Sequence, residues 1–161
     1  MKIFSFILIF FLSPSVIFAH QVIIGKNDWL FYTPELIEQT REVQIQKTLS
    51  LIDKLNYELK TNNVKLIVAV IPLKVKIYPE HLPNNIKLND YLVQNYDLML
   101  DFFNARGISA INFDRAFLTS PDRNGDDPLF FRLDSHWTPK GVMLAAETTK
   151  EYIKNDVSIS Q

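Results

Sequence analysis

The spacing of apolar residues changes along this chain from alternating to helical and back. Residues 22–32 form two short apolar segments around a polar turn, which predicts a β-hairpin. Thr33-Pro34-Glu35 has the N-cap, proline and acid order of a helix start. Apolar residues then recur every three or four positions and predict a long amphipathic helix that ends at Thr61-Asn62-Asn63. Its stripe consists of Ile45, Leu49, Ile52, Leu55 and Leu59.

The middle of the chain predicts a parallel β-sheet. Residues 64–71 are an almost continuous β-branched run, typical of a strand that is buried on both faces, and Pro72 ends it. A helix is expected from Asn89 to about Arg106, with Gly107 as its stop, followed by a strand at residues 109–113. A helix between two strands indicates a right-handed βαβ unit, and hence an α/β fold with a mainly parallel sheet.

The last third of the chain predicts a polar loop, a strand and a helix. Residues 119–128 are rich in turn formers, and an apolar strand is expected to lead into Asp134. Thr138-Pro139 predicts the N-cap and first turn of the final helix. Its inward face is expected to carry Val142, Ala145, Ala146, Thr149 and Tyr152 or Ile153.

The first 19 residues have the pattern of a secretory signal peptide. Lys2 precedes an apolar run that is short for a membrane span, and Ala19 offers a cleavage site. An uncleaved N-terminal anchor is the alternative, and it is the one membrane contact that we expect. Residues 20–161 are then expected to form one exported domain. The net charge of −1 shows no basic footprint for nucleic acid, and the absence of cysteine excludes thiolate chemistry and disulfides.

Asp134 and His136 form the strongest candidate for chemistry. Their side chains would leave the same face of an extended strand, so the carboxylate could accept an imidazole N–H and stabilise the imidazolium. A helix that starts at Thr138 would point its free N–H groups toward this pair. The alternative is a surface turn or a hydrogen-bonded core histidine, with Trp137 and the neighbouring phenylalanines as core.

Two further candidates follow the first parallel strand. Lys74 and Tyr78 lie beyond its carboxyl end, where ligands gather in open α/β sheets, so they are candidate substrate contacts. Solvated loop residues would give the same pattern. The aspartates of residues 119–128 lack the spacing of a calcium loop, so no metal site is expected, and no cofactor.

Three segments resemble the alginate O-acetyltransferase AlgX/AlgJ group, which has an SGNH hydrolase-like domain. They are residues 25–31, residues 68–80 and, most specifically, Asp134-Ser135-His136-Trp137, which matches the group's Asp-x-His-Trp signature. The resemblance implies a three-layer α/β/α fold and a periplasmic enzyme that acetylates an exopolysaccharide such as alginate. It makes Asp134 the residue that orients the imidazole, His136 the general base and Arg132 a neighbour of the site.

The resemblance covers only the N-terminal portion of that domain. The group's nucleophilic serine follows its signature after a further strand, whereas Ser158 and Ser160 have no glycine turn near them, and Ser135 lies between acid and base. The only Gly-x-Ser, at Ser109, precedes the signature. We therefore expect a domain that is truncated before its last strands. A subunit completed by another chain and a non-catalytic relic are the alternatives.

The sequence thus predicts an O-acetyltransferase whose serine is missing from these residues. Its partners would be an exopolysaccharide acceptor, an acetyl donor and other proteins of polysaccharide export or acetylation. Two other functions stay open. With water as the acceptor the same chemistry would make a carbohydrate esterase, and without a nucleophile the chain would be a polysaccharide-binding module.

Overall fold

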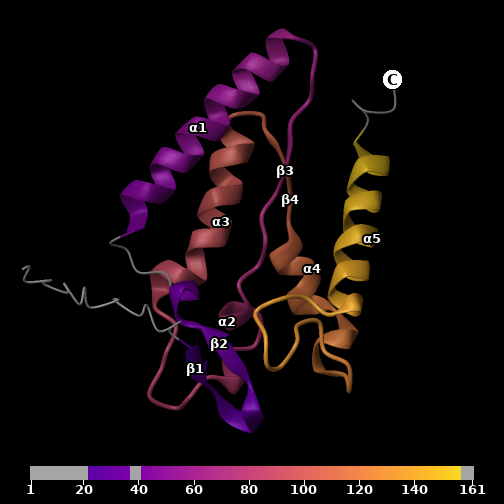
Figure 1. Ribbon diagram of the computed structural model, residues 1–161. Coiled ribbons are helices and arrows are strands. Elements are labelled where there is room, and N and C mark those ends of the chain that lie inside the picture. The colour runs from indigo at the N-terminus through magenta and orange to yellow at the C-terminus, as the bar shows by residue number, and fades with distance from the viewer. Residues whose placement is uncertain (1–21, 37–40, 157–161) are drawn as a thin grey trace, which may run out of the picture.

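A short parallel sheet lies between two helical layers (Figure 1). The computed structural model describes residues 22–36 and 41–156. The expected signal peptide, residues 1–19, lies outside the described residues. In that described part no helix is long and apolar enough to span a bilayer.

The sheet consists of β3 (Ile67–Ala69) and β4 (Ser109–Ile111), with α3 (Asp90–Ala105) between them in the chain. The two strands pair in parallel with Val68 opposite Ala110, so the predicted parallel βαβ arrangement is confirmed. The Asn89 side chain caps α3 by accepting from the Leu92 N–H. Gly107, at φ +64°, follows the end of the helix as the left-handed residue that commonly stops one.

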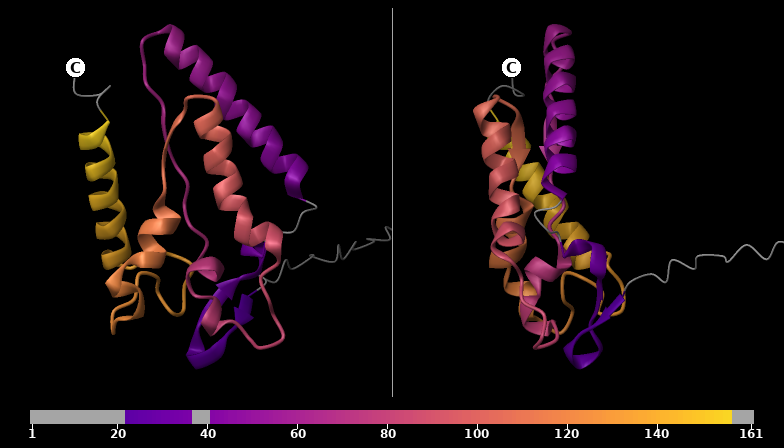
Figure 2. Two further views of the ribbon diagram at one scale, coloured as in Figure 1. Left: turned by 180° about the vertical axis from the view of Figure 1, so that it is seen from behind. Right: turned by 90° about the vertical axis from the view of Figure 1, so that its left-hand side faces the viewer.

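Each face of the sheet packs against its own helices. Val68 and Ala110 pack with Leu49 of α1 (Glu42–Thr61) and Phe103 of α3. The alternate residues Ile67 and Ile111 join a larger core that includes α4 (Phe113–Thr119) and α5 (Pro139–Asn155). The two views of Figure 2 show α1 and α3 on one side of the strands and α5 on the other. The three-layer α/β/α arrangement is therefore confirmed, with two strands in the described part of its central sheet.

An N-terminal hairpin closes one end of the larger core. β1 (Val22–Ile24) and β2 (Leu30–Tyr32) pair antiparallel, as predicted, around a turn in which Asn27 and Asp28 have positive φ angles. Trp29 and Phe31 are buried against the segment that follows β3. That segment contains α2 (Lys74–Ile77) and a 3₁₀ turn at Pro79–His81. The hairpin is thereby fixed beside the ends of the sheet.

Several predicted elements differ from the observed ones. The strand expected at residues 64–71 is limited to β3 and is only half-buried, so burial on both faces was wrong. Thr33–Glu35 forms a 3₁₀ turn, and the long helix begins at Glu42, with residues 37–40 outside the description. The expected loop after Pro72 contains α2, and α4 follows β4 without having been predicted.

The strand expected before Asp134 and parts of two helix faces were also wrong. Residues 131–136 form turns, and the only pairing nearby is an isolated bridge between Phe130 and Trp137. On α5, Ala145 is buried as expected but Val142 is 53% exposed, because the α4 contact falls on another face. On α1 only Leu49 of the predicted stripe is fully buried, since α1 touches the rest of the fold through few residues.

Gly141 offers a direct test of the packing at the start of α5. A Cβ added there would lie 2.2 Å from the carbonyl oxygen of Leu129. We expect Gly141→Ala to lower the free energy of unfolding by about 1–3 kcal/mol, because overpacking outweighs alanine's better helix propensity. Urea unfolding followed by circular dichroism measures this.

Gly125→Ala is the matched control. The nearest atom to its added Cβ is 3.5 Å away and its φ of −76° suits any residue. We expect this variant to stay within about 0.5 kcal/mol of the parent. Equal unfolding midpoints for the two variants would contradict the close approach of α5 to Leu129.

Candidate active site

The segment that holds the acid–base pair is a narrow loop, residues 129–138, here called the site loop. Its two arms are joined by backbone hydrogen bonds from the Thr138 N–H to the Leu129 carbonyl (2.9 Å) and from the Phe131 N–H to the His136 carbonyl (3.1 Å). Thr138 also caps α5, with its Oγ1 accepting from the Gly141 N–H and donating to the Pro128 carbonyl at 2.6 Å. The predicted helix start is confirmed, and it fixes the loop's return arm.

Asp134 and His136 meet at the tip of the site loop. The imidazole Nδ1 lies 2.6 Å from Oδ1 of Asp134, and the same oxygen accepts the backbone N–H of His136 at 3.1 Å. The predicted hydrogen bond is therefore present, although a turn rather than an extended strand forms it. With the proton on Nδ1 held by the carboxylate, Nε2 carries the lone pair that a general base needs.

The hydrogen bond between Asp134 and His136 orients the imidazole but contributes little to the folding stability. The hydrogen bond from the His136 side chain, followed by that from its backbone N–H, lowers the pKa of Asp134. Because the folded pKa lies below the ordinary 3.8, any stability gained is present above that value and is lost as the pH falls through the folded pKa. The His136 and Asp134 side chains are 80% and 53% exposed, and an ion pair so exposed contributes little. The core-histidine alternative is excluded, whereas the exposed turn that holds the pair matches the surface-turn alternative.

A hollow of about 370 Å³ adjoins the imidazole. It lies where the chain leaves the carboxyl end of β3, the expected place for a ligand in this class of fold. The indole Nε1 of Trp137 is buried without a hydrogen-bond partner in the described residues. The lining is mostly apolar and comprises Glu35, Ile71, Pro72, Leu73, Phe130, Ser135, His136, Trp137 and Val142.

Lys74 and Tyr78 do not face this hollow. Both side chains are buried, at 0% and 1% exposure, so the expectation that they contact substrate is not met. The Lys74 ammonium instead donates to backbone carbonyls of β2 and the site loop, and the Tyr78 hydroxyl accepts the Leu129 N–H at 2.9 Å. Burial is the main reason that the pKa of Tyr78 is raised. One turn of chain thus holds the site loop through two side chains.

Arg132 precedes Asp134 and His136 in the site loop. Its side chain is exposed, while its backbone carbonyl accepts the Leu30 N–H at 2.8 Å. Burial is the main reason that the pKa of His81, which stacks on Trp29, is lowered, and the charge of Arg132 lowers it further. A contact between Arg132 and substrate remains a prediction.

Glu35 is a site residue that sequence reasoning missed. Its Oε2 accepts the Val75 N–H at 3.0 Å, at the start of α2, and the residue also lines the hollow beside His136. Burial raises the pKa of Glu35, against the lowering effects of that hydrogen bond and of the Lys74 charge. No local signal marks this role, because Val75 is 40 positions away in the chain.

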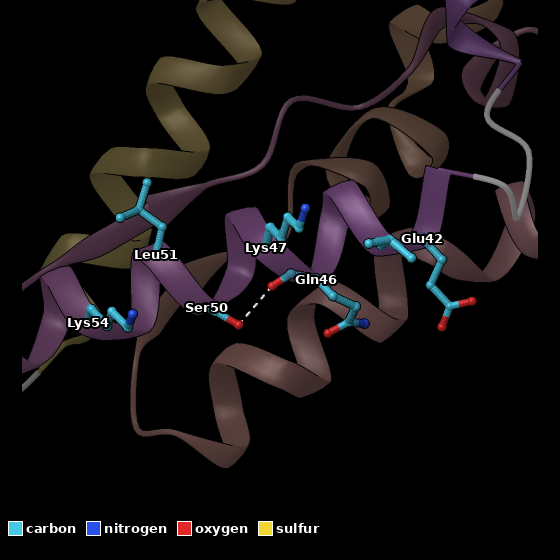
Figure 3. Close-up of a pocket in the computed structure, with 7 residues that line it drawn as sticks. Glu42, Gln46, Lys47, Ser50, Leu51 and Lys54 are labelled. Atoms are coloured by element: carbon cyan, nitrogen blue, oxygen red, sulfur yellow. Dashed lines mark hydrogen bonds between the residues drawn. The ribbon is translucent and has the colours of Figure 1, made fainter.

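Another hollow, on the surface of α1, has no histidine among the described residues that line it. A hollow of about 690 Å³ lies on one side of α1 alone and is lined by Glu42, Val43, Gln46, Lys47, Ser50, Leu51 and Lys54 (Figure 3). Its Ser50 hydroxyl donates to the Gln46 carbonyl at 2.8 Å, a bond within the helix. Among residues 22–36 and 41–156, no three His, Asp or Glu side chains gather in a way that could hold a metal ion.

The Tyr78 hydrogen bond can be tested by deleting one oxygen. Tyr78→Phe leaves the buried Leu129 N–H without an acceptor, so we expect it to lower the free energy of unfolding by about 1–3 kcal/mol. Tyr57→Phe removes a hydroxyl from a side chain that is 68% exposed on α1 and is expected to change little. Indistinguishable urea midpoints for the two variants would show that Tyr78 does not hold the site loop.

Comparison with known proteins assigns the chain to a family. Residues 22–161 match the family model described as "SGNH hydrolase-like domain, acetyltransferase AlgX". The "Probable alginate O-acetylase AlgJ" of Pseudomonas aeruginosa is 32% identical over 128 residues, which cover 78% of this chain and 31% of that protein. The protein of the same name from Pseudomonas fluorescens is 29% identical and matches 86% of this chain and 35% of its own length.

Solved structures agree with this assignment. The O-acetyltransferase domain of Pseudomonas putida AlgJ superimposes with a TM-score of 0.73 at 25% identity, over 83% of this chain and 47% of that domain. Bacillus cereus PatB1 shares the fold, with a TM-score of 0.65 at 22% identity over 86% of this chain and 44% of its own. The chain spans about a third of the length of the curated relatives that it matches. It belongs to the AlgX family of SGNH hydrolase-like acetyltransferase domains.

Proposed function

We propose that this chain is part of an exported O-acetyltransferase that acetylates hydroxyl groups of an exopolysaccharide such as alginate in the periplasm. Family membership supports the reaction class, and the names of the Pseudomonas relatives support the polymer. The observation that carries the proposal is the 2.6 Å contact between Asp134 and His136 beside a mostly apolar hollow. That geometry presents an oriented, solvent-accessible base to a small acyl group.

In the proposed reaction His136 moves one proton in each half. Its Nε2 takes the proton of a serine hydroxyl as the serine oxygen attacks the acetyl carbonyl of the donor, and returns that proton to the departing donor group. In the second half Nε2 deprotonates a sugar hydroxyl, whose oxygen attacks the acetyl-serine carbonyl. The bond from that carbonyl to the serine oxygen then breaks, and Nε2 gives the proton to the serine oxygen, which restores the serine. Asp134 holds Nδ1 and stabilises the imidazolium that forms in each half.

We further propose that the serine comes from a segment outside these 161 residues. The described serine hydroxyls have other engagements: that of Ser50 donates within α1, that of Ser109 faces Asp156, and that of Ser120 accepts the Asp122 N–H. Ser135 lines the hollow but lies between the acid and the base in one tight turn. The match to only 47% of the solved AlgJ domain leaves room for a later segment to supply the nucleophile.

A carbohydrate esterase is the second candidate. The 80% exposure of the His136 side chain leaves the base open to water, which would replace the sugar hydroxyl as acceptor. The two reactions share every step up to the acetyl-enzyme. They differ only in the product, so one assay that follows the acetyl group separates them.

A chimeric domain tests the proposal. Residues 22–156 would replace the matching half of the Pseudomonas putida AlgJ domain, with 4-nitrophenyl acetate as donor and alginate oligosaccharides as acceptor. We expect acetylated oligosaccharide by mass spectrometry and a rate that falls about 10²–10⁴-fold in His136→Ala, because the base is lost. Acetate without acetylated sugar would favour the esterase.

Two serine variants complete the experiment. Ser50→Ala, on the far helical layer, is the matched control and is expected to keep the parent rate. Ser135→Ala asks whether the neighbouring hydroxyl is the nucleophile, and a loss as large as that of His136→Ala would contradict an outside serine. Equal turnover by the parent chimera and His136→Ala would remove His136 from the reaction. A folded parent chimera without turnover would favour a polysaccharide-binding role.

A further inference from the structure

We propose that Lys74 is a positioning residue whose buried ammonium shapes the site loop so that Asp134 and His136 meet. Only the catalytic role of Asp134 and His136 rests on the proposed function. The hydrogen bonds of Lys74 are present whether or not acetyl transfer occurs. Lys74 itself contacts neither the hollow nor the imidazole in any described interaction. It acts through the backbone of the loop.

The ammonium is bonded to carbonyls from two parts of the chain. Its Nζ lies 2.6 Å from the Leu30 carbonyl oxygen in β2. In the site loop it lies 2.7 Å from the Phe131 oxygen, 3.0 Å from the Arg132 oxygen and 2.9 Å from the Asp134 oxygen. An ammonium has three N–H donors, so at least one is shared between two of these four carbonyls. The ammonium therefore links β2 of the hairpin to residues 131–134 of the site loop.

The surroundings of the ammonium make these bonds obligatory. The Lys74 side chain has 0% exposure, and the rings of Trp29 and Phe31 lie 4.9 and 5.1 Å from Nζ. A buried cation without acceptors is strongly unfavourable, so any loop conformation that withdraws these carbonyls is penalised. The charged groups that face it are the carboxylates of Glu35 and Asp134, and both favour its protonated form.

The carbonyls bonded to Lys74 belong to the residues that direct the Asp134 carboxylate toward His136. With the carbonyl of Asp134 held inward by Lys74, its carboxylate reaches the His136 backbone N–H and Nδ1 on the exposed side. The carbonyl of Phe131 is held in the same way, while its N–H closes the loop on the His136 carbonyl. A neutral side chain of similar length would fill the space without ordering these groups.

Lys74→Met, compared with Lys76→Met, tests this role in the full chain. Lys76 is on the same short helix, but its Nζ pairs with Asp114 at 2.8 Å, away from the site loop. We expect Lys74→Met to return the pKa of Asp134 toward 3.8, measured from its carboxyl ¹³C shift. Hydrogen exchange of the Phe131 amide should accelerate about tenfold or more at pH 6, because the bond that closes the loop is weakened.

The control separates positioning from general destabilisation. Lys76→Met removes an ion pair whose side chains are only 11% and 7% exposed, and is expected to lower the unfolding midpoint while leaving the Asp134 titration unchanged. Loss of the Lys74 charge by itself would also raise the Asp134 pKa, so the Phe131 exchange rate decides between positioning and charge. If the Phe131 amide exchanges as slowly in Lys74→Met as in Lys76→Met, the proposal is wrong.

A measurement on the parent chain covers the case in which Lys74→Met does not fold. Burial lowers the pKa of Lys74 to about 8, so at pH 6 the group is protonated and its N–H protons are shielded from solvent. We expect ¹⁵N–¹³C′ couplings across the hydrogen bonds from Nζ to the carbonyls of Phe131 and Asp134. A rapidly exchanging ammonium without such couplings would overturn the proposal. None of these measurements depends on acetyl transfer. If the proposed acetyl transfer failed, the test of Lys74 as a positioning residue would still stand.

Discussion

The buried ammonium of Lys74 is hydrogen-bonded to four backbone carbonyls, which link the N-terminal hairpin to the site loop. The fold places Lys74 at the start of α2 with no exposed surface, where every hydrogen bond of its ammonium goes to a backbone oxygen. Those oxygens come from a hairpin near the start of the chain and from a loop near its end. The arrangement therefore links three separate segments of sequence around one cation, and the loop's chemistry follows from how it is held.

Buried groups fix the site loop, while the Asp134 and His136 side chains at its tip stay exposed. The acid and the base are open to solvent, where their attraction contributes little to stability. The conformation of the site loop is instead held by hydrogen bonds of three buried side chains. They involve the Lys74 ammonium, the Tyr78 hydroxyl, which accepts the Leu129 N–H, and the Thr138 cap at the start of α5. An accessible base on a rigid support is the combination that acyl transfer requires.

Local patterns predicted the features that depend on nearby residues. The hairpin, the parallel pairing across α3, the Thr138 cap and the hydrogen bond of Asp134 with His136 all involve short spacings or simple periodicity. The support of the site loop was not predictable in this way, because Lys74 reaches carbonyls that are 44 to 60 positions away. A lysine is also among the residues most often exposed, so its residue type alone does not mark Lys74 as buried. The expected strand before Asp134 failed for a related reason, since turns present to Lys74 the carbonyls that a strand would direct sideways.

We infer that the hydrogen bonds of Lys74 shape the site loop so that Asp134 and His136 meet, and a high-resolution crystal structure of the full chain at pH 6 would reveal both sets of contacts. We expect Nδ1 of His136 about 2.6 Å from Oδ1 of Asp134, with the Lys74 ammonium within hydrogen-bonding distance of the Phe131, Arg132 and Asp134 carbonyls. A Lys74 side chain turned to solvent while the pair stays intact would contradict it. So would a fully bonded ammonium with the imidazole and carboxylate apart.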